Sequence, residues 1–263
     1  MTLHKTKIIA VANQKGGVGK TTTCVNLGAT FSEMGHRVLV VDFDPQGNTT
    51  SGSGVSKQTM EYDVRGLLLG ESSFHDVCIS ETEAGYDLLP SDIQLTEAEV
   101  GLISKPRAQY RLKDVLESSA NTYDFVLIDC PPALSMLTVN GLIAADGVIV
   151  PVQCEFFALE GIAALMETID QVRATHNANL VIDGVLRTMY DPRTSLTRQV
   201  SQQLEKFFGD RVFKTVIPRN IRLAEAPSHG LPVLKYDRLS KGALSYLALA
   251  SELRKRLNLK TAA

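Results

Sequence analysis

The sequence predicts a single α/β domain in which a mostly parallel, twisted sheet carries helices on both faces. The 263 residues are 44% hydrophobic and 21% charged, which suffices for one large buried core. Short β-branched runs alternate with longer helical stretches along the chain. The runs are continuously apolar rather than alternating in polarity, which is typical of strands buried on both faces of a parallel sheet.

The expected elements follow one another as repeated βαβ units. Strands are predicted at residues 8–12, 38–41, 125–128, 148–152, 181–186 and 212–217, and helices at 20–34, 108–119, 136–145, 158–175, 195–208 and 239–257. Right-handed crossovers through helices join such strands into one sheet. The Gly-, Ser- and Thr-rich stretch 47–56 follows a strand directly and is predicted to be a mobile loop. Because no repeat or linker interrupts the pattern, residues 1–263 are expected to form one domain.

The cysteines and the N-terminal residues indicate the compartment. Cys24, Cys78, Cys130 and Cys154 lie far apart and form no CxxC or His/Cys cluster, which favours reduced, buried thiols over disulfides or zinc. The chain's start lacks a secretory pattern, and no window approaches the ~20 apolar residues that span a bilayer. We therefore expect a cytoplasmic protein.

The charges are distributed unevenly along the chain. Net charge at pH 7 is only −2, which by itself argues against nucleic acid as a partner. Residues 180–263, however, carry 15 Lys and Arg against 7 Asp and Glu, a net of +8, whereas residues 1–179 carry 12 against 22, a net of −10. One face formed by the C-terminal third is therefore a candidate polyanion surface.

A glycine-rich motif follows the first predicted strand. Residues 13–22 read NQKGGVGKTT and run directly into a helix. Glycines let backbone N–H groups curl round a phosphate at a helix N-terminus, where the dipole favours negative charge. We expect Lys20 to reach the β- and γ-phosphates and Thr21 to ligate Mg²⁺. The motif departs from GxxxxGK[ST] at Gln14, where a glycine is usual, and adds Lys15. It predicts a P-loop NTPase fold.

Carboxylates follow two other predicted strands. Asp42 and Asp44 come after residues 38–41, and Asp129 comes after 125–128. The carboxyl ends of parallel strands form a common ligand crevice, so these side chains should lie near the P-loop. Asp129 is expected to hold the Mg²⁺ shell through water, with Asp42 beside it at the metal site. Asp42 or Asp44 is expected to orient the attacking water.

The motifs resemble those of the ParA/MinD family of deviant Walker A P-loop ATPases, and among them the chromosomal ParA proteins of the Soj type. The segment KGGVGKTTTCVNLG is similar to the deviant Walker A motif, whose additional lysine corresponds to Lys15. Four further segments resemble blocks of the Soj type, so that the similarity covers essentially the whole chain: VVDFDPQGNTTSG, IDCPPALSMLTVN, PVQCEFFALEG and TVIPRNIRLAEAPSHG.

The resemblance implies an ATPase with ATP and Mg²⁺ as cofactors. ATP is then held between two subunits, and Lys15 reaches across to the partner's phosphates. Asp44 acts in hydrolysis together with Lys15 and Lys20, and Pro218 and Asn220 lie near the adenine. The implied nucleotide-binding residues are Lys15, Gly16, Gly17, Val18, Gly19, Lys20, Thr21, Thr22, Pro218 and Asn220.

The resemblance also implies a cycle on DNA. The ATP-bound homodimer binds double-stranded DNA without sequence preference and is nucleoid-associated, and a ParB-like DNA-binding protein stimulates slow hydrolysis and releases it. Arg193 and Arg222 match family arginines implicated in DNA binding, within a basic surface at about residues 187–241. Weaker candidates in and beside that surface are Arg187, Arg198, Lys214, Arg219, Lys235, Arg238 and Lys241.

Two other functions share this scaffold. A MinD-like ATPase that cycles on a membrane needs a C-terminal amphipathic helix. The tail at residues 250–263 is basic with three leucines, Leu253, Leu257 and Leu259, but it is short and lacks aromatic anchors, so we expect these leucines to pack on the domain and no stable membrane association. A metabolic ligase or a nitrogenase iron-protein-like reductase is the second alternative, and the lone Cys130 does not supply the cysteine set that the reductase needs.

Overall fold

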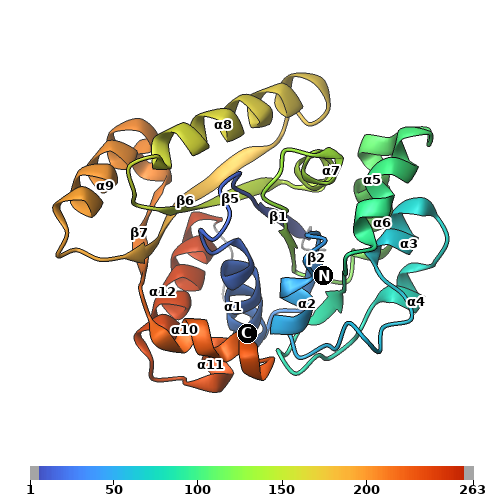
Figure 1. Cartoon of the computed structure of the whole chain (residues 1–263), viewed down its shortest axis with the longest axis horizontal. Helices are drawn as coiled ribbons and strands as arrows, with labels where there is room; N and C mark the ends of the chain where they lie inside the picture. The colour runs from blue at the N-terminus through green and yellow to red at the C-terminus, as the bar shows by residue number, and fades with distance from the viewer. Residues whose placement is uncertain (1–5, 258–263) are drawn as a thin grey trace.

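The computed structural model describes residues 6–257 and contains one seven-stranded sheet (Figure 1). The strand order is β3-β2-β4-β1-β5-β6-β7, and each neighbouring pair runs parallel. The strands are β1 (Lys7–Val11), β2 (Val38–Asp42), β3 (Asp87–Leu89), β4 (Phe125–Asp129), β5 (Gly147–Gln153), β6 (Val181–Tyr190) and β7 (Val212–Pro218). The predicted α/β class and parallel sheet are confirmed.

Helices cover both faces of the sheet (Figure 1). In chain order they are α1 (Lys20–Glu33), α2 (Asn48–Gly52), α3 (Val64–Leu69), α4 (Phe74–Val77), α5 (Leu95–Ile103), α6 (Arg111–Ser119), α7 (Met136–Ala144), α8 (Ala158–Thr175), α9 (Ser195–Phe208), α10 (Ile221–Glu225), α11 (Val233–Tyr236) and α12 (Lys241–Arg256). Three short 3₁₀ turns lie at Ala108–Tyr110, Gly209–Arg211 and Ala226–His229.

Two hydrophobic cores lie on opposite faces of the sheet. Successive residues of a strand point to opposite faces, so Ile9 and Val11 join the core under α1 and α12, whereas Ala10 joins the core under α7 and α8. Leu253 of α12 is fully buried and Leu257 packs against the same core, as expected for the tail. Leu259 and the first five residues lie outside the part of the chain that the structure describes.

The prediction of a mobile loop at residues 47–56 is wrong. The segment contains α2, whose Thr49 and Thr50 are fully buried. Gly47 precedes this helix with a φ of 60°. The sequence of the helix, NTTSG, has low intrinsic helix propensity. Tertiary hydrogen bonds of the two threonines stabilise a helix that local preference does not predict.

Three smaller expectations concern disulfides, zinc clusters and membrane-spanning segments. The four cysteines are free, and Cys24, Cys130 and Cys154 are buried. Among residues 6–257 no group of three or more His, Cys, Asp and Glu is placed to hold a metal. No helix between these residues has both the length and the apolar character needed to cross a membrane.

Candidate nucleotide-binding site

The P-loop lies between the carboxyl end of β1 and α1, at the centre of the sheet edge. Gly17 and Gly19 have φ values of 72° and 91°, which few side chains tolerate, and they turn the chain into α1. The backbone N–H groups of residues 16–22 donate no hydrogen bond to other described residues, and Gly16 and Gly17 are exposed. These donors form a concave site for an anion at the start of a helix.

Two side-chain hydrogen bonds fix the loop to the neighbouring strands β5 and β6. The Asn13 amide donates to the Pro151 carbonyl at 2.7 Å, and its Oδ1 accepts from the Lys15 N–H at 2.9 Å. On the other side the Thr188 hydroxyl donates to the Val18 carbonyl at 2.8 Å. The cradle is therefore held by β5 and β6 before any phosphate binds.

Lys20 is the buried cation of the site. Its side chain folds back along the loop, and Nζ donates to the Lys15 carbonyl at 3.2 Å. Burial lowers the pKa of Lys20, an effect that the charges of Asp129 and Asp44 oppose. The negative charge of a γ-phosphate in the cradle would stabilise the charged form of Lys20, which burial disfavours.

Asp129 is held between two hydroxyl groups. Its Oδ2 accepts from Thr21 and from Thr49, both at 2.7 Å, whereas its buried Oδ1 has no hydrogen-bond partner in the described chain. Burial raises the pKa of Asp129 to about 6. An unpartnered buried carboxylate oxygen beside a threonine hydroxyl suits a hard cation with water ligands, so Thr21 and Asp129 fit Mg²⁺.

Asp42 lies beside Asp129 in the sheet but is differently engaged. The two residues are register partners on β2 and β4. Oδ2 of Asp42 accepts from the N–H and the hydroxyl of Thr50, both at 2.7 Å, and Oδ1 accepts a long bond from the Asp44 N–H at 3.4 Å. Burial, reinforced by Asp129, raises the pKa of Asp42 to about 8. The geometry therefore favours Asp129 over Asp42 as the residue that faces the metal, and a bound cation would favour the ionised form of both carboxyls.

Asp44 has a carboxylate oxygen available to a ligand. Oδ1 accepts from the Gln46 N–H at 3.0 Å, and the residue's carbonyl accepts from Ser91 at 3.1 Å. No residue between 6 and 257 donates to its Oδ2, and the residue is 8% exposed. The charge of Asp44, together with that of Asp129, opposes the lowering of the Lys20 pKa by burial.

A cavity of about 210 Å³ opens beside the start of α1. It is lined on one side by Gly19 and Thr22 and on the other by Pro218 and Asn220. Asn220 also caps α10, because its Oδ1 accepts from the Leu223 N–H at 3.2 Å. The predicted adenine residues thus lie next to the predicted phosphate residues. This cavity is our candidate base pocket.

The two proposed DNA arginines follow neighbouring strands. Tyr190 and Pro218, the last residues of β6 and β7, are register partners, so the loops that carry Arg193 and Arg222 begin side by side. The Arg193 side chain is 87% exposed and forms two hydrogen bonds with Asp191, at 2.9 and 2.7 Å. These bonds lower the pKa of Asp191 to about 2.

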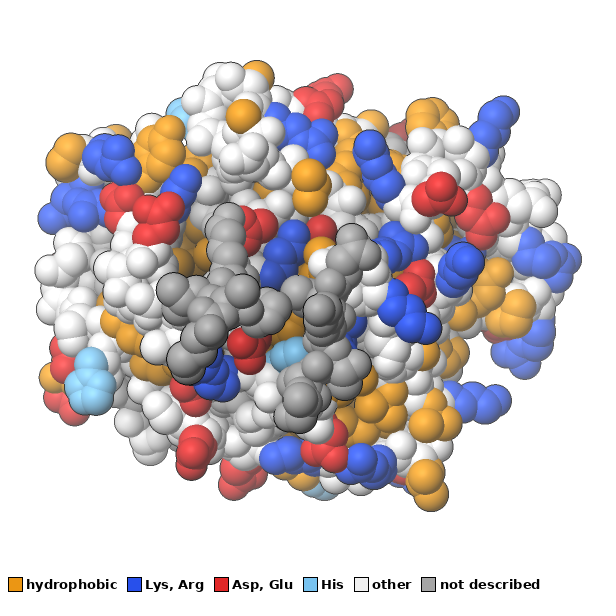
Figure 2. All heavy atoms as spheres, turned by 180° about the vertical axis from the view of Figure 1, so that it is seen from behind, with side chains coloured by type: hydrophobic (Ala, Val, Ile, Leu, Met, Phe, Trp, Pro, Cys, Tyr) orange, Lys and Arg blue, Asp and Glu red, His pale blue; other side chains and the backbone are white. Residues whose placement is uncertain are grey.

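Arg222 is also engaged by carboxylates. Its guanidinium lies 2.8 Å from Glu225 and 3.2 Å from Asp237, and the side chain is 50% exposed. In the view of Figure 2 many Lys and Arg side chains gather on the side of the molecule formed by α9 and β7. Both arginines therefore already have carboxylate partners within the chain.

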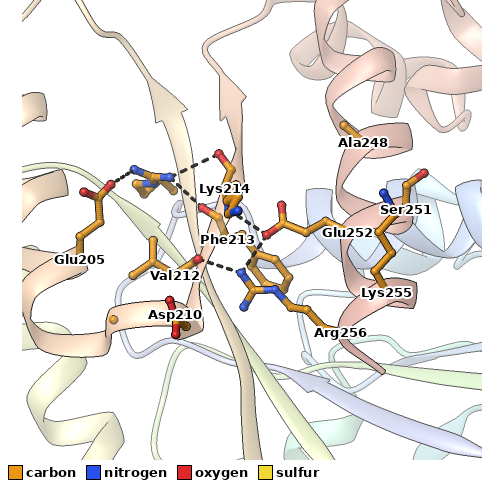
Figure 3. Close-up of a pocket in the computed structure, with 12 residues that line it drawn as sticks. Glu205, Asp210, Val212, Phe213, Lys214, Ala248, Ser251, Glu252, Lys255 and Arg256 are labelled. Carbon is orange, nitrogen blue, oxygen red and sulfur yellow. Dashed lines mark hydrogen bonds and ion pairs between the residues drawn. The ribbon is translucent and has the colours of Figure 1, made fainter. Parts of the chain in front are cut away.

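Arg187 is not a DNA contact, contrary to its inclusion among the weaker candidates. The residue is 7% exposed. Its guanidinium bonds Glu205, Ser201 and the Phe213 carbonyl, and it holds an irregular stretch of β7 against β6 (Figure 3). Charge counting along the sequence does not distinguish such a buried structural arginine from a surface one.

The hollow of about 820 Å³ at edge strand β7 contains none of the predicted nucleotide residues (Figure 3). Arg256 and Glu252 of α12 reach across it. Glu252 accepts from the N–H groups of Lys214 and Thr215 at 2.8 Å each, and Arg256 donates to the Val212 carbonyl at 2.8 Å. These contacts satisfy the strand edge and discourage pairing with another strand, which is a structural role.

These features define a P-loop nucleotide-binding protein. A glycine-rich loop joins strand β1 to the helix that carries Lys20 and Thr21, and Asp129 lies on the adjacent strand. A family model described as an AAA domain matches residues 6–182. The chain is 51% identical over 246 residues to the sporulation initiation inhibitor protein Soj of Bacillus subtilis, covering 94% of this chain and 97% of that protein. It is 48% identical over 254 residues to the chromosome partitioning protein ParA of Caulobacter vibrioides, covering 96% and 95%.

The chain belongs to the ParA/MinD family of P-loop ATPases and is close to the Soj-type ParA proteins. Among solved structures it resembles cobyrinic acid a,c-diamide synthase of Mycobacterium smegmatis with bound ADP and magnesium, at 37% identity and a TM-score of 0.85 over 98% of this chain and 99% of that one. It also resembles the cell division ATPase MinD of Pyrococcus furiosus, at 26% identity and a TM-score of 0.75 over 95% and 98%.

Thr49 is a site residue that the sequence did not reveal, and its role can be tested. We expect Thr49→Val to weaken Mg²⁺-dependent nucleotide binding about tenfold, because Asp129 loses one of its two orienting donors. Thr49→Ser, which keeps the hydroxyl, should behave like the parent, as should Thr59→Val at an exposed position. Titration of Mg²⁺ against a fluorescent ATP analogue measures the effect. Equal midpoints for Thr49→Val and the parent would assign Thr49 to folding alone.

Proposed function

We propose that this protein is an ATP-dependent partition ATPase for a chromosome or plasmid. Mg·ATP drives two copies into a sandwich dimer, the dimer binds DNA without sequence preference, and hydrolysis stimulated by a ParB-like partner releases it. The observation that carries the proposal is one continuous edge of the sheet. The P-loop, Asp44 and Asp129 lie at the carboxyl ends of their strands, and the loops of Arg193 and Arg222 follow the carboxyl ends of β6 and β7 along the same edge.

ATP and Mg²⁺ fit the residues of this edge. The free N–H groups of residues 16–22 and Lys20 would hold the phosphates, Thr21 and Asp129 would hold the Mg²⁺ shell, and the cavity beside Pro218 and Asn220 would take the adenine. The bound metal supplies charge neutralisation at the phosphates. Asp44, whose Oδ2 accepts no hydrogen bond from residues 6–257, would orient the attacking water.

The dimer is proposed from Lys15 and its surroundings. The Lys15 side chain is 38% exposed, and its amine pairs with Glu155. A Cβ at Gly16 would meet nothing in its own chain, which leaves room for a partner lysine to approach the bound phosphates. Joining two subunits through ATP places two basic surfaces on one body and raises the effective concentration of the second for DNA.

The experiment that tests the function is DNA binding in three nucleotide states. A duplex of arbitrary sequence is titrated with the protein in Mg·ATP, in Mg·ADP and without nucleotide. We expect strong binding in Mg·ATP alone, together with a dimer in light scattering. Equal DNA affinity in all three states would refute the switch. Liposome co-sedimentation in the same states addresses the MinD-like alternative, which the burial of Leu253 does not favour.

Arg193→Glu and Arg222→Glu test the DNA surface. Each is expected to lower DNA affinity about tenfold or more for every sequence, because attraction to a phosphate becomes repulsion. The log–log dependence of affinity on salt should become shallower by about one unit for each phosphate that the variant no longer neutralises. Filter binding or anisotropy at several salt concentrations in Mg·ATP gives both quantities.

Arg107→Glu is the matched control for these variants. Arg107 is 64% exposed and bonds Asp114 at 2.9 Å, an arrangement like that of Arg193 and Asp191, but it precedes α6 in the net-negative part of the chain. Its substitution should leave DNA affinity unchanged. If Arg193→Glu and Arg222→Glu also bound DNA normally, the DNA surface would have to lie elsewhere.

A further inference from the structure

Lys15 is paired within its own chain. Its amine lies 2.7 Å from Oε2 of Glu155, just beyond the end of β5, and the other oxygen of Glu155 accepts from the Gln153 amide. The backbone of Lys15 is fixed from the same strand through Asn13, which also bonds the Pro151 carbonyl. In the single chain, both the backbone and the side chain of Lys15 are thus tied to β5.

The Lys15–Glu155 pair is exposed enough to open. The two side chains are 38% and 47% exposed, and pairs of this kind are weak because water and salt screen them. A triphosphate carries more negative charge than one carboxylate and, in a desolvated interface, is the stronger partner for an ammonium group. The amine can therefore exchange Glu155 for a phosphate group if one is brought within reach.

The residues that follow Glu155 form an exposed aromatic surface. Phe156 and Phe157 are 75% and 62% exposed, and their rings meet edge to face with centroids 5.1 Å apart. Large aromatic side chains that are left exposed beside a binding site are typical of a surface that a partner covers. Here the aromatic pair directly adjoins the carboxylate that holds Lys15.

We propose that Glu155 is a positioning residue that retains Lys15 in the single chain and releases it when a second, nucleotide-bound copy covers Phe156 and Phe157. The inference rests on the proposed ATP-dependent dimer. In the separate subunits each Lys15 is bound to its own Glu155. In the dimer each Lys15 turns to the partner's phosphates, so two ion pairs open for every dimer formed. Glu155 therefore sets the protein concentration at which ATP brings two chains together.

Glu155→Gln tests this role, because it removes the charge and keeps the shape. We expect the midpoint of dimerisation in saturating Mg·ATP to fall about two- to tenfold in protein concentration, since two weak pairs no longer have to open. Glu160→Gln is the matched control. It removes the same charge five residues further on, at an exposed position of α8 that does not contact Lys15. Its midpoint should equal that of the parent.

A second measurement examines Lys15 directly, in the nucleotide-free monomer. Acetylation of lysines, followed site by site with mass spectrometry, should label Lys15 about two- to fivefold faster in Glu155→Gln than in the parent or in Glu160→Gln. Unchanged labelling of Lys15, or a dimer midpoint that is equal or higher in Glu155→Gln, would overturn the inference. If the parent itself stayed monomeric in Mg·ATP, the proposed function would fail, and the labelling result would still decide whether Glu155 retains Lys15.

Discussion

Replacement of Lys20 by alanine is expected to abolish measurable ATP binding, with a loss in affinity of at least about a hundredfold. Hydrogen bonds to charged groups contribute about 1.5–3 kcal/mol each, and this amine is placed to make more than one to the β- and γ-phosphates. Each 1.4 kcal/mol corresponds to about a tenfold change in affinity. Lys20 is also a buried cation, and the charges of Asp129 and Asp44 act on it. Without it, a triphosphate would meet these carboxylates directly.

Equilibrium binding of a fluorescent ATP analogue measures the Lys20→Ala effect, and dimerisation and DNA binding should be lost with it. Lys113→Ala is a suitable control, because Lys113 pairs with Glu117 on α6, away from the P-loop. Thermal melting without nucleotide shows whether Lys20→Ala remains folded. A folded Lys20→Ala protein with the parent's affinity for ATP would mean that the phosphates bind elsewhere.

The parallel sheet and the P-loop could be predicted because their signals are local. Six of the seven strands contain apolar runs that could be recognised, although β6 and β7 also include polar residues, and the phosphate motif is one unbroken segment between a strand and a helix. Strand β3 escaped prediction because only three residues, Asp87–Leu89, form it. The short helix α2 escaped because its sequence has low helix propensity, and Thr49 and Thr50 are anchored by hydrogen bonds to Asp129, 80 residues away, and to Asp42, eight residues away.

The partners of charged side chains could not be predicted, because they too depend on contacts that form only in the folded chain. The net positive charge of residues 180–263 can be counted from the sequence. The hydrogen bonds of Arg187 with Glu205 and Ser201, however, depend on how β6 packs against α9. The contact of Lys15 with Glu155 likewise joins residues that follow β1 and β5, two strands that are neighbours only in the folded sheet. The residue types that carry the chemistry were therefore readable from the sequence, whereas their competing partners were not.

Asp44→Asn is expected to bind Mg·ATP normally and to hydrolyse it at least about a hundredfold more slowly. An asparagine keeps the side-chain oxygen that accepts from the Gln46 N–H at 3.0 Å, so the loop before α2 retains its shape. The substitution removes the negative charge at Oδ2, the oxygen that no described residue engages. Positioned carboxylates that accept a proton or orient water contribute about 10²–10⁴-fold to such reactions.

Two readouts separate the role of Asp44 in hydrolysis from a role in binding. Single-turnover release of phosphate gives the rate of the chemical step, and the affinity for a fluorescent ATP analogue should stay within about threefold of the parent. Because ATP persists in this variant, its dimer should accumulate and remain on DNA longer than the parent dimer does. Asp92→Asn is the control, since Asp92 likewise accepts a backbone N–H two residues further on, from Gln94 at 2.8 Å, outside the crevice. Hydrolysis by Asp44→Asn at a rate close to that of Asp92→Asn would exclude Asp44 from the chemical step. It would leave Asp42 and Asp129, each of which has one oxygen engaged by threonine, as the remaining carboxylates to consider.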